Sequence, residues 1–262
     1  MKRIETALIT GASGGIGLEL AKIHAAQGDH LVLVARNISK LEELKATLEK
    51  AHGIQVYVIG KDLAAPGSAP EVYEEVAGQG IQVNYLINNA GFGDFGRFYE
   101  TDWEKESKMI ALNITTLTRF CKLYLKDMVA RNSGKIMNVA STAAFQPGPF
   151  MAVYYATKAY VLHFSEAINN EVRHKNITVT ALCPGATESG FQAAADMESS
   201  KLVKGKELPS PEEVARYGYK AMMKGKAVAV HGWKNRLLAT SVRFTPRNMV
   251  VNLVRRVQEE AR

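Results

Sequence analysis

Short apolar runs alternate with longer amphipathic stretches from one end of the 262-residue chain to the other. The short runs lack a polar side, which is typical of parallel strands covered on both faces. The longer stretches carry apolar residues three and four positions apart, as helices packed on a sheet do. A repeated strand–helix order favours right-handed crossovers and one doubly wound sheet. The pattern therefore predicts an α/β fold of Rossmann type: a mostly parallel, seven-stranded sheet with helices on both faces.

Seven runs are predicted as strands: 4–9, 31–34, 55–59, 84–87, 135–139, 178–182 and 227–230. Six stretches are predicted as helices: 16–27, 39–51, 69–77, 102–131, 153–175 and 211–224. Ser210 and Glu213 form a predicted capping box at the last helix, with Pro211 at its first position. No linker or repeat interrupts this order. We therefore predict a single domain over 1–262, with 186–209 as a substrate loop and 234–262 as a basic amphipathic extension.

Composition excludes several classes of protein. Apolar residues make up 47% and charged residues 23%, which excludes a disordered, collagen-like or disulfide-framework chain. Cys121 and Cys183 form no Cys-x-x-Cys pair and the six histidines are scattered, so we expect free thiols and no metal site. No apolar run reaches 18 residues, and the N-terminal sequence lacks the apolar core of a signal peptide. A cytoplasmic location is the resulting expectation.

The first predicted strand is followed by TGASGGIG at 10–17 and then directly by a helix. Glycines let the backbone approach a pyrophosphate, and a helix N-terminus supplies unpaired N–H groups. A ligand-free turn is the alternative, but four glycines within seven residues favour phosphate binding. The predicted cradle comprises Gly11, Ser13, Gly14, Gly15, Ile16 and Gly17. A literal G-x-G-x-x-G at 91–96 meets no helix until about 101–102, so we interpret it as a flexible active-site loop.

The second predicted strand ends with Arg36 where enzymes that use NAD usually place an acidic residue. A guanidinium matches phosphate oxygens in a bidentate manner, so Arg36 predicts a 2′-phosphate and thus NADP(H). A solvated arginine at a strand end is the alternative interpretation.

Three polar residues suggest acid–base chemistry after the fifth strand. Ser141 follows that strand, and Tyr154 and Lys158 lie four positions apart on one predicted helix face. A second Tyr-x-x-x-Lys, at Tyr57, falls on a strand, where this spacing does not align side chains. Carbonyl reduction needs a proton donor at the oxygen, and a free tyrosine has a pKa of about 10. We expect the Lys158 ammonium to lower the pKa of Tyr154, and Ser141 to hydrogen-bond the substrate oxygen.

In this order and spacing, the chain from about residue 4 to 231 resembles the short-chain dehydrogenase/reductase family. The matching features are TGASGGIG at 10–17, Asp62, NNAG at 88–91, Asn113, Ser141, YYATK at 154–158 and PGATES at 184–189. The resemblance, strongest to the NADP-linked branch, implies hydride transfer between NADP(H) and a carbonyl or secondary alcohol. It implies that Tyr154 moves the proton, that Lys158 also holds the nicotinamide ribose, and that Asn113 joins a water-linked proton relay.

The resemblance also implies further cofactor contacts. Asp62 and Leu63 would contact the adenine, and Asn88, Asn89, Ala90 and Gly91 would border the cofactor. Pro184, Gly185 and Thr187 are implied to bind the cofactor, with Thr187 meeting the nicotinamide carboxamide through its backbone and hydroxyl, and Ser189 stands where the family has a later threonine. A homodimer or homotetramer, formed through helices 102–131 and 153–175, is implied in the same way.

An apolar, uncharged substrate is suggested by residues around the predicted site. They are Phe92, Phe95, Phe145, Phe150, Phe191 and Met197. Packing of these side chains on the core is an equally open interpretation. A catalytically silent NADP(H)-sensing or scaffold protein on the same fold is the alternative function.

The net charge of +7 resides in the C-terminal quarter. Residues 201–262 hold 14 Lys/Arg and 5 Asp/Glu, and the basic residues of the tail alternate with apolar ones. This amphipathic pattern favours a helix packed on the domain over contact with an anionic membrane or an acidic partner. Nucleic-acid binding is not expected.

Overall fold

The computed structural model describes residues 4–188, 190–195, 205 and 207–259. Its seven strands form one parallel sheet in the order β3-β2-β1-β4-β5-β6-β7. The strands are β1 (Thr6–Thr10), β2 (His30–Ala35), β3 (Val56–Gly60), β4 (Tyr85–Asn88), β5 (Gly134–Val139), β6 (Ile177–Cys183) and β7 (Val228–Val230). The predicted doubly wound sheet is confirmed.

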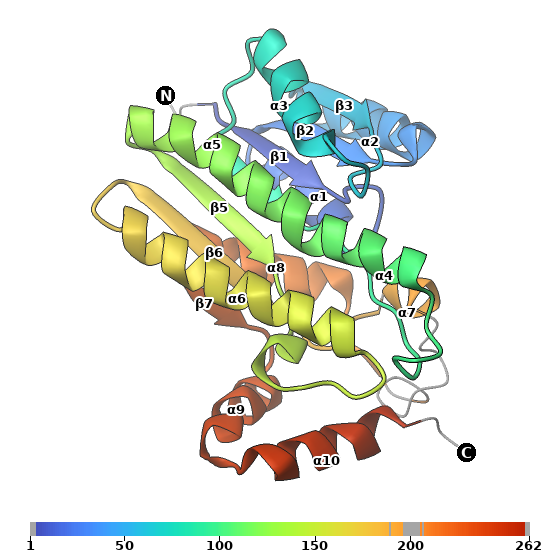
Figure 1. Ribbon diagram of the computed structural model, residues 1–262. Helices are drawn as coiled ribbons and strands as arrows, with labels where there is room; N and C mark the ends of the chain where they lie inside the picture. The colour runs from blue at the N-terminus through green and yellow to red at the C-terminus, as the bar shows by residue number, and fades with distance from the viewer. Residues whose placement is uncertain (1–3, 189, 196–204, 206, 260–262) are drawn as a thin grey trace.

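Helices cover both faces of the sheet (Figure 1). One face carries α3 (Ser68–Gly78), α5 (Leu117–Arg131) and α6 (Ala152–Val172), and the other carries α1 (Gly15–Ala26), α2 (Ile38–His52) and α8 (Pro211–Met223). The remaining helices are α4 (Trp103–Ile110), α7 (Phe191–Ala194), α9 (Trp233–Ser241) and α10 (Arg247–Gln258). Ser210 and Glu213 form the predicted capping box at α8.

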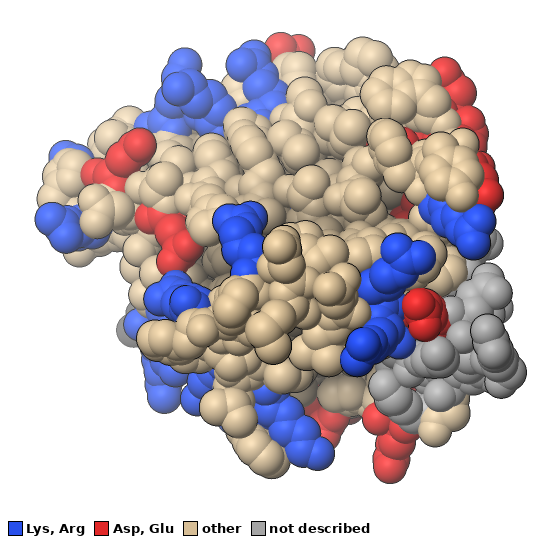
Figure 2. All heavy atoms as spheres, turned by 60° about the horizontal axis from the view of Figure 1, so that its bottom comes forward, with Lys and Arg blue, Asp and Glu red and all other residues tan. Residues whose placement is uncertain are grey.

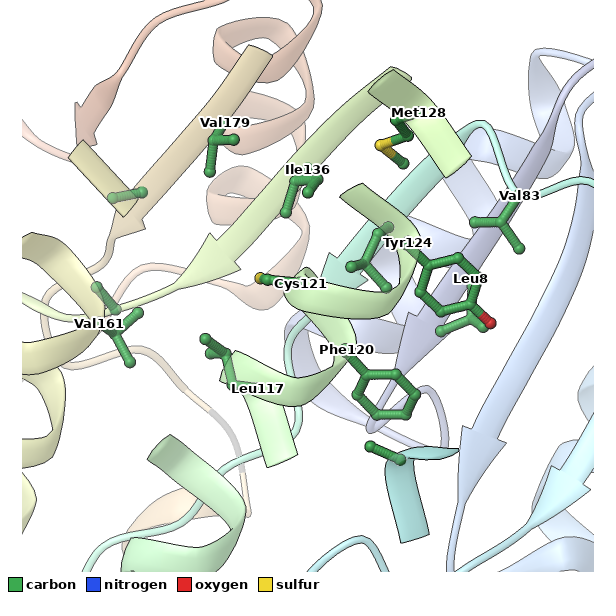
Figure 3. Close-up of a cluster of buried hydrophobic side chains, with 14 of the residues drawn as sticks. Leu8, Val83, Leu117, Phe120, Cys121, Tyr124, Met128, Ile136, Val161 and Val179 are labelled. Atoms are coloured by element: carbon green, nitrogen blue, oxygen red, sulfur yellow. The ribbon is translucent and has the colours of Figure 1, made fainter. Parts of the chain in front are cut away.

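Strand side chains alternate between two apolar cores. Leu8, Phe120 and Val161 belong to one buried cluster beneath α5 and α6 (Figure 3), whereas the neighbours of Leu8, Ala7 and Ile9, belong to the cluster that faces α1 and α8. This alternation explains why the strands have no polar side, since both faces are buried.

The predicted helix over 102–131 is the main correction to the fold. The chain forms α4, then a π-helical turn over Ala111–Thr116, then α5. A π-helical turn inserts an extra residue into a helix and is frequent at functional sites. Asn113 lies within it.

The winding direction reverses between β1 and β4, which lie side by side in the sheet. In open parallel sheets, ligands bind beyond the carboxyl ends of the strands at such a switch point. The loops that follow β1 and β4 are therefore the place to look for a site.

Candidate active site

The loop after β1 leaves the N-terminus of α1 open to a ligand. Gly11 and Gly15 have left-handed φ angles of +67° and +55°. Gly14 precedes α1 in extended backbone and supplies no side-chain cap, and a Cβ added there would meet no atom within 4 Å. The first N–H groups of α1 therefore have no side-chain cap, which suits an anionic group such as a pyrophosphate. Ser13 and Ile16 are half-buried in the same turn.

Gly17 allows α1 to approach this turn closely. A Cβ on Gly17 would lie 2.4 Å from the Gly11 carbonyl oxygen and 2.5 Å from Asn89 Nδ2. The Asn89 amide donates to the carbonyls of Thr10 at 2.9 Å and of Gly11 at 3.2 Å. No larger residue fits this position without displacing the loop.

Thr10, to which the sequence analysis gave no role of its own, ties the loop after β1 to the loop after β4. Its Oγ1 accepts hydrogen bonds from the backbone N–H groups of Asn89 and Ala90, both at 3.0 Å. The signal in the sequence was a hydroxyl at the end of an apolar strand, at the first position of TGASGGIG. This contact holds the two sides of the switch point together.

Arg36 and Asp62 lie at the same edge of the sheet, beyond β2 and β3, and both side chains are exposed. Asp62 Oδ1 accepts from the Ala64 N–H at 3.0 Å. The Leu63 side chain is buried in the core, and its carbonyl accepts from Thr116 Oγ1 at 2.7 Å. An adenosine group along this edge could contact the Arg36 guanidinium. It would contact mainly the backbone of Leu63, because the Leu63 side chain is buried.

Ser141, Tyr154 and Lys158 come together at the carboxyl end of β5. Tyr154 lies in the first turn of α6 and hydrogen-bonds Ser141, which follows β5. Lys158, one turn further along, places its Nζ 5.8 Å from the centroid of the Tyr154 ring. The ammonium donates to the Val139 carbonyl at 2.7 Å. A hydroxyl, a phenol and an ammonium therefore share one small site.

Burial governs the ionisation of this site. It raises the pKa of Tyr154 to about 12, although the hydrogen bond with Ser141 acts to lower it. Burial also lowers the pKa of Lys158 to about 8. In the chain by itself the pKa of Tyr154 thus lies above that of a free tyrosine, opposite to the expected direction, because loss of hydration is the largest cause of its shift. Near neutral pH the phenol is protonated.

Asn113 joins the loop after β4 to α6. Its Nδ2 donates to the Phe92 carbonyl at 3.0 Å and to Thr157 Oγ1 at 3.1 Å, and its Oδ1 accepts from the Phe92 N–H at 3.3 Å. A Cβ on Gly91 would lie 2.9 Å from Asn113 Oδ1 and 3.5 Å from Lys158 Nζ. Thr157, which the sequence analysis quoted within YYATK without giving it a role, is therefore part of this junction.

The glycines of the second G-x-G-x-x-G pack against side chains. A Cβ on Gly93 would lie 2.9 Å from Phe191 Cζ and 3.3 Å from Tyr154 Cδ2. The next helix begins only at Trp103, capped by Asp102. The predicted absence of a helix N-terminus at these glycines is confirmed.

The loop after β6 lies next to Ser141. The Pro184 carbonyl accepts from the Thr142 N–H at 2.8 Å, and Thr187 Oγ1 donates to the Gly185 carbonyl at 3.0 Å. A Cβ on Gly185 would lie 2.6 Å from Asn235 Nδ2, so α9 packs directly on this loop. Ser189 lies outside the described residues.

Apolar side chains surround Tyr154. Met109, Met151 and Tyr155 form a buried cluster with it, and Phe92, Phe95 and Phe191 pack against that cluster. The Phe191 ring lies 5.3 Å from the Tyr154 ring. Phe145 instead packs against the core beneath α5 and α6. Met197 and much of the predicted substrate loop 186–209 lie outside the described residues.

A hollow of about 450 Å³ lies elsewhere, between α3 and α5, and is lined by Tyr73, Tyr124 and Arg131. It also borders Val83, which precedes β4, so it lies at the amino ends of the strands. The polar groups described above converge at the opposite edge, which identifies that edge as the candidate active site. Among the described residues, no group of His, Cys, Asp and Glu could hold a metal ion.

Comparisons with known proteins agree with this geometry. A family model described as short chain dehydrogenase matches residues 5–199. The very-long-chain 3-oxoacyl-CoA reductase of Anas platyrhynchos is 29% identical over 269 residues, covering 98% of this chain and 80% of that protein. The 17-beta-hydroxysteroid dehydrogenase type 3 of Rattus norvegicus is 33% identical over 183 residues, covering 68% and 58%. A short-chain dehydrogenase from Sphingobium yanoikuyae, solved in complex with NADPH, superposes with a TM-score of 0.83 at 31% identity, covering 92% and 94%.

Proposed function

The chain belongs to the short-chain dehydrogenase family, and from this membership we propose that it is an NADP(H)-dependent oxidoreductase that interconverts an apolar ketone and its secondary alcohol. The observation that carries the proposal is the meeting of Ser141, Tyr154 and Lys158 at the edge of the sheet onto which the open end of α1 faces.

The cofactor fits the residues of this edge. The uncapped N-terminus of α1 and the left-handed Gly11 and Gly15 would hold a pyrophosphate, and exposed Arg36 would hold a 2′-phosphate. The NADPH bound in the Sphingobium yanoikuyae structure supports this assignment. When bound, NADPH supplies the hydride.

The proton comes from Tyr154. A pKa of about 12 keeps the phenol protonated near neutral pH, which is the form that carbonyl reduction requires. Ser141 Oγ, hydrogen-bonded to Tyr154, holds the substrate oxygen beside the phenol. Lys158, with its pKa lowered to about 8, can pass a proton toward Tyr154 after each turnover.

The substrate is apolar around its reacting carbon, because Phe92, Phe191 and Met151 surround Tyr154. The names of the two relatives, which concern very-long-chain acyl and steroid substrates, support a bulky molecule. We further propose a homodimer or homotetramer and a cytoplasmic location. Buried, free Cys121 and Cys183 are consistent with a reducing compartment.

The decisive experiment replaces Tyr154 with phenylalanine and follows NADPH absorbance over a panel of bulky ketones. Loss of the proton donor should lower turnover by about 10²–10⁴-fold, while the dissociation constant for NADPH stays nearly unchanged. Tyr155→Phe is the matched control, because the hydroxyl of this neighbouring tyrosine bonds Gln258 instead of Ser141.

Substantial activity in Tyr154→Phe would refute the role of the phenol. Tight NADPH binding by the wild type without turnover of any ketone would favour the silent sensor or scaffold instead.

A further inference from the structure

The two C-terminal helices expose large apolar side chains on their outer side. We call this region the C-terminal surface and define it by Trp233, Leu237, Leu238, Phe244, Met249 and Leu253. Their exposed fractions run from 58% for Leu253 to 83% for Phe244. Trp233 and Leu237 are one helical turn apart in α9, as are Met249 and Leu253 in α10.

The inner side of these helices already serves the packing of the extension on the domain. Ala239 and Val250 are buried, and Gln258 is buried where it donates to the Tyr155 hydroxyl. The sequence analysis favoured a helix packed on the domain, and α10 does pack there. Packing on the domain uses only the inner side of the helices. Exposed apolar patches mark interaction sites, so the apolar outer side is a candidate for one.

The charge around the C-terminal surface is predominantly positive, and Glu259, which pairs with Arg255 at 3.8 Å, is the acidic exception among the described residues there. Residues 233–258 contain six Lys/Arg and no Asp/Glu. All six side chains are exposed: Lys234, Arg236, Arg243, Arg247, Arg255 and Arg256. Figure 2 shows Lys and Arg groups on both sides of a tan surface in the part of the molecule that comes forward. An occupant of this surface must therefore be apolar at its centre and anionic around it.

A second copy of the chain does not meet this requirement. A two-fold interface brings the same patch of both copies together, so arginines would face arginines. An anionic bilayer does meet it, because basic amphipathic helices lie in the interface with their apolar side toward the acyl chains and their cations at the headgroups.

We propose that the C-terminal surface docks this protein on the surface of an anionic phospholipid bilayer. The aromatic and aliphatic side chains enter the interfacial layer, and the arginines contact lipid phosphates. Helices of 9 and 12 residues lie on the bilayer and do not cross it. In agreement, no helix among the described residues is long and apolar enough to span a membrane.

The docked surface adjoins the active site. Arg255 lies 5.4 Å over the Phe150 ring, and Val254 packs against the buried cluster that contains Tyr154. Docking would thus bring the substrate side of Tyr154 close to the lipid, so that an apolar ketone could enter from the bilayer. This last step rests on the proposed function, whereas the docking itself does not.

Co-sedimentation of the full chain with vesicles tests the electrostatic half of the proposal. We expect binding to phosphatidylcholine vesicles that contain phosphatidylglycerol, weaker binding at high salt, and little binding to phosphatidylcholine alone. Arg243→Gln, Arg247→Gln and Arg256→Gln together should weaken binding roughly 100-fold, at about fivefold for each cation. The matched control replaces exposed Lys50, Lys122 and Lys126 with glutamine and should bind like the wild type.

Tryptophan fluorescence tests the apolar half. The chain has two tryptophans, so Trp103→Phe leaves Trp233 as the sole reporter, and its emission should shift to the blue on anionic vesicles. Leu237→Ser, Phe244→Ser and Leu253→Ser together should abolish the shift. Ile4→Ser, Val129→Ser and Met223→Ser remove exposed apolar side chains elsewhere and should leave it intact. NADPH binding by each variant verifies that it is folded.

Absence of binding to anionic vesicles at low salt would overturn the proposal. Equal binding of the triple-arginine variant and the triple-lysine control to these vesicles would also overturn it. So would a dimer of the wild type that binds no vesicles and that dissociates only when Leu237, Phe244 and Leu253 are replaced. A chain that binds vesicles but reduces no ketone would refute the proposed function and leave the docking intact.

Discussion

Gly17→Ala tests whether close approach of α1 to the turn after β1 builds the cofactor site. The added methyl would lie 2.4 Å from the Gly11 carbonyl oxygen and 2.5 Å from Asn89 Nδ2. Neither atom can yield easily, because Gly11 occupies a left-handed turn and the Asn89 amide holds the carbonyls of Thr10 and Gly11.

The expected cost follows from these contacts. Overpacking at a rigid site costs about 3 kcal/mol, and weakening the Asn89 hydrogen bonds adds about 1 kcal/mol. The higher helix propensity of alanine relative to glycine offsets about 1 kcal/mol of this loss in stability. A net loss of about 3 kcal/mol should lower Tm by about 6–12 °C for a chain of this size.

Thermal unfolding and NADPH titration measure the two expected effects. Displacement of the loop should raise the NADPH dissociation constant at least about tenfold, the equivalent of one good hydrogen bond. Gly14→Ala adds the same methyl to extended backbone with no atom within 4 Å, and should change stability by at most about 1 kcal/mol. If Gly17→Ala keeps its Tm within about 2 °C of the wild type and binds NADPH normally, the close-approach argument is wrong.

Two further predictions concern Arg36 and Lys158. Arg36→Leu should weaken NADPH binding by about 10–100-fold, the loss of a charge-assisted contact, with little change for NADH; equal effects on both cofactors, measured by titration, would contradict the 2′-phosphate assignment. Burial lowers the pKa of Lys158 to about 8, whereas lysine in an unfolded chain titrates near about 10.4. Between these values the unfolded state binds more protons, so the unfolding free energy should rise with pH. In the wild type the unfolding free energy should rise by about 3 kcal/mol relative to Lys158→Met over this pH range. Denaturant unfolding of both proteins at several pH values measures this difference. If the unfolding free energies of the two proteins run parallel with pH, the Lys158 ammonium is not buried as described.

Local sequence patterns were sufficient to predict the strands of the sheet and the helices that cover it. The apolar runs and the capping box at Ser210 depend on neighbours in sequence, so their positions could be read before the fold was known. The π-helical turn at Asn113 could not, because nothing in the local pattern of 102–131 distinguishes it from regular helix. The turn carries Asn113 to the loop after β4, a contact between segments 21 residues apart.

The positions expected to carry catalysis were also open to prediction, but their ionisation was not. Ser141, Tyr154 and Lys158 could be selected by residue type and spacing. The pKa of Tyr154 depends on how much water the fold removes from the phenol and on the hydrogen bond with Ser141. Both depend on the packing of distant segments.

By itself, then, the sequence determined the α/β architecture, the glycine turn and the residue types available for chemistry, because periodicity and motif spacing are local properties. Only the tertiary structure decided which of these groups come into contact and which apolar side chains remain exposed on the surface. It joined Thr10 to Asn89, set Asn235 against Gly185, and turned the apolar side chains of α9 and α10 outward. The physical reason is that burial and close contact arise between residues far apart in the chain, which only the folded arrangement brings together.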